Sequence, residues 1–273
     1  MEPLFSFLSD ITVDGVSLWF LLLVCFGVFL AAFMDSIAGG GGIISVPIYL
    51  MALGNVPTYF ILGTNKLSSG IGTVFSTARF VKGGYVDWKL CIPGAILSML
   101  GSVAGTWLQH HTPDRILKYL LLIILPVIAI ITLRGRSWPE HPDPRSPTAT
   151  LAIVCAAALI VGCYDGYYGP GTGTFLMISF IRLAKMDTRH AAGCTKVINL
   201  ASNIGGICSS LAAGYVFLGV GLIASLFSIL GHYIGAGLAI KNGSKIVRPA
   251  VIIVLLLLTA KVGSELLFPQ LWT

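Results

Sequence analysis

The chain has 273 residues, of which 56% are hydrophobic and only 10% are charged. A soluble domain usually has about 25% charged residues because its surface faces water, so this composition excludes an ordinary soluble protein. The net charge of +6 is interpreted as a signal of loop orientation across a bilayer, and no nucleic-acid partner is expected. The chain is therefore predicted to be an all-α polytopic membrane protein.

Apolar segments follow one another along the chain at regular positions. In the first half they lie at about 16–36, 42–54, 58–80, 89–109 and 115–133. In the second half they lie at about 148–166, 172–184, 188–211, 216–239 and 246–267. Backbone groups in hydrocarbon must be paired within a helix or a closed barrel, and continuous apolar runs favour helices. We expect about 8–10 transmembrane helices, each needing about 20 residues to cross the bilayer.

The two halves resemble each other at a constant offset of 130 residues. Asp35 and Asp165 each end an apolar stretch and open a glycine-rich loop. Further identities at this offset pair Gly39 with Gly169, Gly41 with Gly171, Gly63 with Gly193, Lys66 with Lys196, and Gly84-Tyr85-Val86 with Gly214-Tyr215-Val216. Such self-similarity indicates duplication of one unit. The predicted domains are a first transmembrane repeat (1–133), a cytoplasmic proline-rich linker (134–147) and a second transmembrane repeat (148–273).

The second segment of each repeat is glycine-interrupted and shorter than a membrane span. Segments 42–54 and 172–184 either cross a thinned region or re-enter beside the segment before them. In both cases each repeat crosses the membrane an odd number of times, so the two repeats are predicted to be inverted. Basic residues in loops 79–89, 182–190 and 241–248, and in the linker, place these loops in the cytoplasm. The basic loop 110–118 is the exception to this assignment.

The two glycine-rich loops are candidate anion sites. Each precedes a short helix, and a helix N-terminus has unpaired N–H groups and a positive dipole end that favour an anion. Glycines allow a ligand to approach these amides closely. The simpler interpretation is that the glycines only permit a tight turn. The loop residues predicted to bind substrate are Gly39, Gly40, Gly41, Gly42, Gly169, Gly171, Thr172, Gly173 and Thr174.

Two lysines lie in segments that otherwise suit the membrane. An unpaired ammonium is costly there, so Lys66 and Lys196 need a partner or a function. One interpretation is that each lysine neutralises the aspartate of its own repeat. The other is that both lysines face a shared cavity and attract an anion, with Asp35 and Asp165 in a proton-coupling role. Polar residues beside the lysines are included in the predicted substrate site: Asn65, Ser69, Thr195 and Asn199.

Other polar residues give weaker signals. His232 is interpreted as a residue that forms an interhelical hydrogen bond. The six cysteines are interpreted as small packing residues because they lie in apolar surroundings without metal-ligand spacing. No nucleophile–base pair and no phosphate-binding loop is found, so we expect no catalytic residues, no metal, no cofactor and no enzyme activity.

These motifs resemble those of the sulfite exporter TauE/SafE family. The resemblance rests on the loops Asp35–Gly42 and Gly169–Gly173, and on the stretches Gly63-Thr64-Asn65-Lys66 and Gly193-Cys194-Thr195-Lys196. It implies a multi-pass permease of the bacterial inner (plasma) membrane that moves sulfite, sulfoacetate or other organosulfonates. It also implies that the glycine loops, Lys66 and Lys196 bind the substrate.

The leading hypothesis is a secondary transporter that exports a small sulfur-containing anion by alternating access, with proton coupling left open. The alternatives are an anion channel or facilitator, and a permease for thiosulfate or another small anion that uses intramembrane cysteines. An intramembrane enzyme or sulfur relay using Cys163 or Cys194 is a further alternative. The expected partners are the anion and the lipid bilayer, and a homodimer is left open.

Overall fold

A computed structural model describes residues 12–53, 56–113, 115–117 and 145–242 of the chain. The helices are α2 (Leu18–Ala38), α3 (Gly42–Leu53), α4 (Thr58–Lys82), α5 (Trp88–His110), α7 (Pro147–Tyr167), α8 (Thr172–Ile178) with the π-helix η1 (Ser179–Leu183), α9 (Thr188–Ala212) and α10 (Leu218–Asn242). Each predicted segment in the described ranges matches a helix or, for 172–184, α8 with η1. The predicted segment 246–267, nearly all of 115–133 and most of the linker 134–147 lie outside the described residues.

A short hairpin precedes the first long helix. Strands β1 (Thr12–Val13) and β2 (Val16–Ser17) are antiparallel, with Val13 opposite Val16. The two residues of the turn, Asp14 and Gly15, both have positive φ, as a tight two-residue hairpin turn requires. The Asp14 carboxylate accepts a hydrogen bond from the Val220 amide at 2.9 Å, so the hairpin caps the start of α10, which is far away in the sequence.

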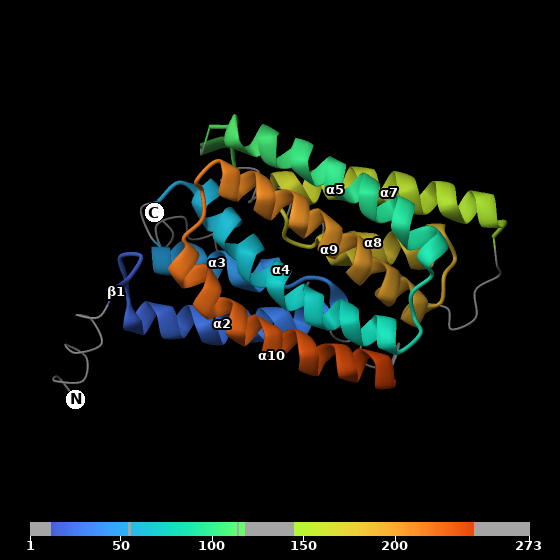
Figure 1. The fold of residues 1–273 in the computed structure, drawn as a ribbon, viewed down its shortest axis with the longest axis horizontal. Helices are drawn as coiled ribbons and strands as arrows, with labels where there is room; N and C mark the ends of the chain where they lie inside the picture. Colours follow the sequence, from blue (N-terminus) through green and yellow to red (C-terminus); the bar gives the residue numbers. More distant parts are fainter. Residues whose placement is uncertain (1–11, 54–55, 114, 118–144, 243–273) are drawn as a thin grey trace, which may run out of the picture.

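The long helices form two groups of three. Helices α2, α4 and α10 pack together, and helices α5, α7 and α9 form the other group. Figure 1 shows α2 and α10 along one side, α5 and α7 along the other, and α4 and α9 between them. Each group combines helices of both halves, because α10 joins two helices of the first half and α5 joins two helices of the second.

Close backbone contacts show how the helices run. Gly101 and Gly105 of α5 lie against the Leu159 and Cys163 carbonyls of α7, so these helices are parallel. In the same way, Gly231 and Gly235 of α10 lie against the carbonyls of Phe29 and Phe33 in α2. A side chain at any of these glycines would meet backbone atoms at 2.0–2.6 Å. Small residues at such positions are typical of helices that pack closely in a membrane.

The central helices α4 and α9 cross in opposite directions. Gly63 near the start of α4 contacts Ser210 near the end of α9, whereas Thr77 near the end of α4 donates a hydrogen bond to the carbonyl of Lys196 at 3.2 Å. Corresponding helices of the two halves are therefore antiparallel at the centre of the molecule.

The molecule exposes apolar side chains and buries a set of polar groups along its central helices. Side chains such as Phe26, Trp107, Ile160 and Leu226 are more than 60% exposed, and continuous apolar exposure of this extent is unfavourable in water. The buried faces of α4 and α9 instead contain hydroxyl, amide and ammonium groups. Among the described residues, α2, α5, α7 and α10 are long and apolar enough to cross a membrane. These features fit a mostly helical chain surrounded by lipid.

Candidate functional site

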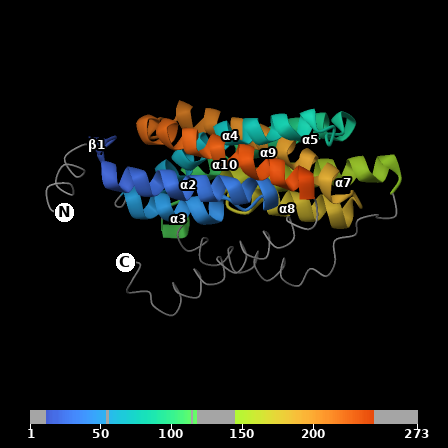
Figure 2. The same cartoon turned by 90° about the horizontal axis from the view of Figure 1, so that it is seen from below.

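The glycine loops of the two halves meet near the centre of the molecule. Helix α2 ends at Ala38 and is capped by Gly39, which has φ +78°. The loop after α7 turns at Gly169 and Gly171, with φ +94° and +87°. The Thr174 amide donates to the Gly39 carbonyl at 3.1 Å. A side chain on Gly39 would meet the backbone of Gly173 at 2.2 Å, so the loops touch through bare backbone. Figure 2 shows α3 and α8, the helices after these loops, on the same side of the molecule.

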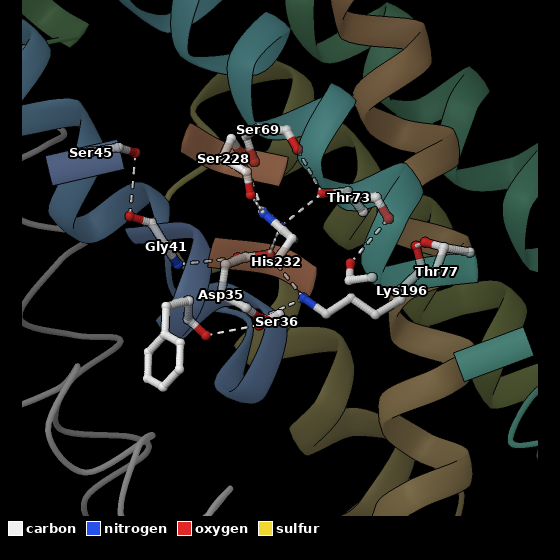
Figure 3. Close-up of polar contacts among 12 residues, drawn as sticks. Asp35, Ser36, Gly41, Ser45, Ser69, Thr73, Thr77, Lys196, Ser228 and His232 are labelled. Carbon is white, nitrogen blue, oxygen red and sulfur yellow. Dashed lines mark hydrogen bonds and ion pairs between the residues drawn. The ribbon is translucent and has the colours of Figure 1, made fainter. Parts of the chain in front are cut away.

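The first loop contains a buried charge cluster, which we call the Asp35 site and define as Asp35, Lys196 and His232. The Asp35 Oδ1 atom accepts a hydrogen bond from the Gly41 amide at 3.1 Å. The Lys196 ammonium lies 2.9 Å from Asp35 Oδ2 and also donates to the Asp35 carbonyl. Asp35 occupies the last turn of α2, where the helix dipole disfavours an anion. The Lys196 cation therefore compensates both the carboxylate and the helix end (Figure 3).

His232 completes the Asp35 site from α10. Its Nε2 atom lies 3.2 Å from Asp35 Oδ2 and 3.3 Å from the Thr73 hydroxyl, and its Nδ1 atom lies 3.1 Å from the Ser228 carbonyl. The imidazole fits beside α4 because position 72 is glycine: a side chain there would meet His232 Nδ1 at 2.6 Å. Figure 3 shows the ring between Asp35, Thr73 and Ser228.

The second loop contains a matching cluster, which we call the Asp165 site and define as Asp165, Lys66, Ser202 and Thr172. The Lys66 ammonium lies 2.8 Å from Asp165 Oδ2. The Ser202 hydroxyl donates to the same oxygen at 2.7 Å, and the Thr172 hydroxyl donates to Oδ1 at 2.8 Å. Both lysines and both aspartates are less than 7% exposed, so these are buried pairs that would be costly to break.

The lysine of each half pairs with the aspartate of the other half. The interpretation that each lysine neutralises the aspartate of its own repeat is therefore wrong. The antiparallel crossing of α4 and α9 is the physical reason. It brings Lys66 against Gly206 of α9, where a side chain would meet the lysine Cδ at 2.7 Å, and so directs the ammonium toward α7 and Asp165.

A polar cavity of about 20 Å³ lies between the two sites. A buried water needs a cavity of roughly 10–15 Å³, so this cavity has room for one or two water-sized molecules. Its lining includes many residues expected from the sequence: Asp35, Gly39, Gly42, Asn65, Lys66, Ser69, Asp165, Gly169, Gly171, Thr172, Gly173 and Asn199. The structure thus brings both loops and the polar faces of α4 and α9 to one place.

Five of the predicted substrate residues do not line this cavity: Gly40, Gly41, Thr174, Thr195 and Lys196. The amides of Gly41 and Thr174 are already engaged, by Asp35 and by the Gly39 carbonyl respectively. At the start of α3, the protein's own carboxylate thus occupies a position where an external anion was expected. Lys196 is fully buried against Asp35, which itself lines the cavity.

Several residues of these clusters were not in the predicted site. Asn203 and Tyr168 line the cavity, and Ser202 binds Asp165. Asn203 and Ser202 follow Lys196 and Asn199 at helical spacing, so the polar stripe on this helix contained the signal. His232 had no such local pattern. Cys163 and Cys194, considered for sulfur chemistry, do not line the cavity.

Comparison with known proteins shows similarity over most of the chain. The family model of the sulfite exporter TauE/SafE matches residues 24–262. A probable membrane transporter protein, ORF9 of Sinorhizobium sp., is 34% identical over 89% of this chain and 93% of its own length. The probable membrane transporter protein YfcA of Escherichia coli K12 is 33% identical over 87% and 89%, and one from Haemophilus influenzae is 31% identical over 92% and 96%. No solved structure matches the chain.

Proposed function

Because the chain belongs to the sulfite exporter TauE/SafE family and is a membrane transporter, we propose that it exports a small sulfur-containing anion such as sulfite, sulfoacetate or another organosulfonate. The observation that carries the proposal is the pair of buried lysines contributed by corresponding helices around one polar cavity. A buried ammonium is costly in a membrane, and intramembrane charges usually mark a substrate or ion pathway.

Alternating access follows if the two halves are inverted repeats. The antiparallel crossing of α4 and α9, and the exchange of α5 and α10 between the helix groups, support this arrangement. In inverted-repeat transporters the substrate site lies at the repeat interface, near broken helices, and the repeats rock around it. The meeting of the two glycine loops is the corresponding place in this molecule.

The basic loops support a location in the inner membrane with these loops in the cytoplasm. The Arg189 guanidinium lies 5.7 Å from the centre of the Tyr85 ring, and Arg79 donates to the Tyr233 carbonyl at 2.9 Å. These contacts bring the end of α4 with the loop after it, the start of α9 and the C-terminal half of α10 to one end of the molecule. The opposite end has the aromatic cluster of Tyr59, Phe60 and Tyr215.

The chemistry of binding would be an exchange of anions at the lysines. A sulfonate or sulfite oxygen accepts the same charge-assisted hydrogen bonds as a carboxylate. Lys66 already lines the cavity, and side-chain amides from Asn65, Asn199 and Asn203 offer further donors. The cavity must widen before a polyatomic anion enters, which is the expected consequence of movement between the repeats.

Anion flux in reconstituted vesicles tests this function. Sulfite and sulfoacetate are the probes, and the wild-type chain should show saturable flux that depends on their gradient. Lys66→Ala and Lys196→Ala should each reduce this flux by at least tenfold. The matched control is Lys82→Ala, which removes an exposed lysine at the end of the same helix as Lys66. Unchanged flux in both buried-lysine variants would show that the lysines do not form the substrate site.

A further inference from the structure

The Asp35 and Asp165 sites differ at equivalent positions. At the repeat offset of 130 residues, His232 corresponds to Ser102, and Ser202 corresponds to Gly72. The Asp165 carboxylate therefore has hydroxyl donors beside its lysine, whereas the Asp35 carboxylate has an imidazole. Histidine is the side chain that most readily changes charge near neutral pH, so only the Asp35 site contains a group of this kind.

The neighbours of His232 Nε2 favour a hydrogen on this nitrogen. The Thr73 hydroxyl can donate to the Ser69 carbonyl at 2.8 Å and thereby offer a lone pair toward His232. Asp35 Oδ2, the other neighbour of Nε2, also accepts. An Nε2 atom without a hydrogen would face two acceptors, which is unfavourable at a buried position.

The other ring nitrogen is suited to gain or lose a proton in place. Nδ1 lies 3.1 Å from the Ser228 carbonyl, which can only accept, and 3.4 Å from the Ser228 hydroxyl, which can donate. Neutral His232 accepts a hydrogen bond from the hydroxyl, and protonated His232 donates one to the carbonyl. Both charge states therefore have a partner without movement of the ring.

The same carboxylate oxygen contacts both His232 and Lys196. Asp35 Oδ2 lies 2.9 Å from the Lys196 ammonium and 3.2 Å from His232 Nε2. The groups that face the ring are Asp35 from α2, Thr73 from α4 and, through Asp35, Lys196 from α9. When the imidazole becomes a cation, it neutralises Asp35, and the attraction that holds Lys196 on this carboxylate falls.

A second cavity of about 10 Å³ reaches His232. Its size approaches that of one water molecule. It shares Asp35, Asn65 and Ser69 with the cavity between the two sites. These three polar residues therefore lie beside both the imidazole and the place proposed for the anion.

We propose that His232 in the Asp35 site binds a proton together with the transported anion, and that this proton releases Lys196 from Asp35 to bind the anion. The inference rests on the proposed transport function. A solvent proton (hydronium) adds to Nδ1, and no covalent bond between heavy atoms changes. The Asp35 carboxylate then pairs with the imidazolium in place of the Lys196 ammonium. The Asp165 site has hydroxyl donors in place of a histidine, so no proton is bound there in this step.

Calorimetric titration of the purified full-length chain with sulfoacetate, at several pH values near neutrality and in two buffers of different ionisation heat, tests the inference. The wild type should take up about one proton per anion, and its affinity should fall about tenfold per pH unit as pH rises, because one bound proton is linked to binding. His232→Gln keeps a donor toward Asp35 but cannot become charged. Its affinity should be weak and constant within about twofold, without proton uptake.

Two further variants make the outcome decisive. His190→Gln is the matched control, because His190 lies at the surface beside Asp187 and away from both cavities, and it should behave as the wild type. Asp35→Asn retains the Oδ1 acceptor for the Gly41 amide but removes the charge that holds Lys196, so its affinity should be high and independent of pH. Binding without pH dependence in the wild type, or unchanged pH dependence in His232→Gln, overturns the inference alone. No binding of sulfoacetate or sulfite by the wild type overturns the proposed function, and this inference with it.

Discussion

The Asp35 and Asp165 sites are built from the same ion pair but differ in its surroundings. In both, a lysine from a central helix reaches an aspartate of the opposite half. Lys196 shares its carboxylate with an imidazole, whereas Lys66 shares its carboxylate with two hydroxyls. A buried charge must keep its partner, which preserves the pair in both halves. The other contacts of the carboxylate are not ionic in the Asp165 site, and these are the contacts that differ between the two sites.

The largest expected effect compares the two lysines. Lys66→Ala leaves the buried Asp165 with hydroxyl donors alone and should lower the free energy of unfolding by about 3–5 kcal/mol. Lys196→Ala should cost about 1–2 kcal/mol less, because a charged His232 can replace the lost cation. Denaturant titration in mixed micelles measures both values. Equal losses in the two variants would show that the imidazole does not compensate.

A slightly smaller effect is expected where the two loops touch. Gly39→Ala introduces a left-handed non-glycine residue and a contact at 2.2 Å with the Gly173 backbone, so it should cost about 2–5 kcal/mol. Gly84→Ala is the matched control, because its φ of +76° is similar and nothing lies within 4 Å of the added carbon. It should cost about 1–2 kcal/mol. Similar losses in both variants, measured by thermal unfolding, would contradict the close contact between the loops.

A double-mutant cycle tests the crossed pairing. Lys66→Met and Asp165→Asn should show a coupling energy of about 1–3 kcal/mol, because these side chains are in direct contact. The cycle of Lys66→Met with Asp35→Asn, which joins residues of one repeat, should give about 0.5 kcal/mol or less. A larger coupling energy for Lys66 with Asp35 than for Lys66 with Asp165 would contradict the crossed pairing and support pairing within each repeat.

The smallest effect concerns the hydroxyl ligands of Asp165. Ser202→Ala removes a donor to a buried carboxylate and should cost about 1–2 kcal/mol. Ser209→Ala is the control on the same helix, because its hydroxyl bonds only the preceding turn, at the Gly205 carbonyl. It should change stability by at most about 0.5 kcal/mol. A negligible cost for Ser202→Ala would indicate that Lys66 alone satisfies Asp165.

The helices were predictable because hydropathy and glycine punctuation are local signals. The predicted segments 58–80 and 188–211 differ by at most two residues at either end from α4 and α9. The polar faces of these helices were also predictable, since Lys66 and Ser69 follow helical spacing. These features depend on neighbouring residues only.

The partners of the charged groups could not be read in this way. A duplicated sequence makes Asp35 and Asp165 equivalent candidates for Lys66, and only the crossing of α4 and α9 decides between them. His232 is isolated in its own helix and meets Asp35 from 197 residues away. The contact of this histidine with Asp35 depends on tertiary packing, which cannot be predicted from the residues around position 232 in the sequence.

The exchange of helices between the two groups also determines the order in which charges meet during synthesis. Lys66 leaves the ribosome 99 residues before Asp165, so the growing chain must accommodate an ammonium whose counter-ion does not yet exist. Lys196 instead emerges when Asp35 has long been made. Helix α10, the third helix of the group with α2 and α4, is synthesised only after all three helices of the other group, α5, α7 and α9, have been made. The group that contains α2 and α4, the first two long helices in the described part of the chain to be translated, is thus the last to be completed.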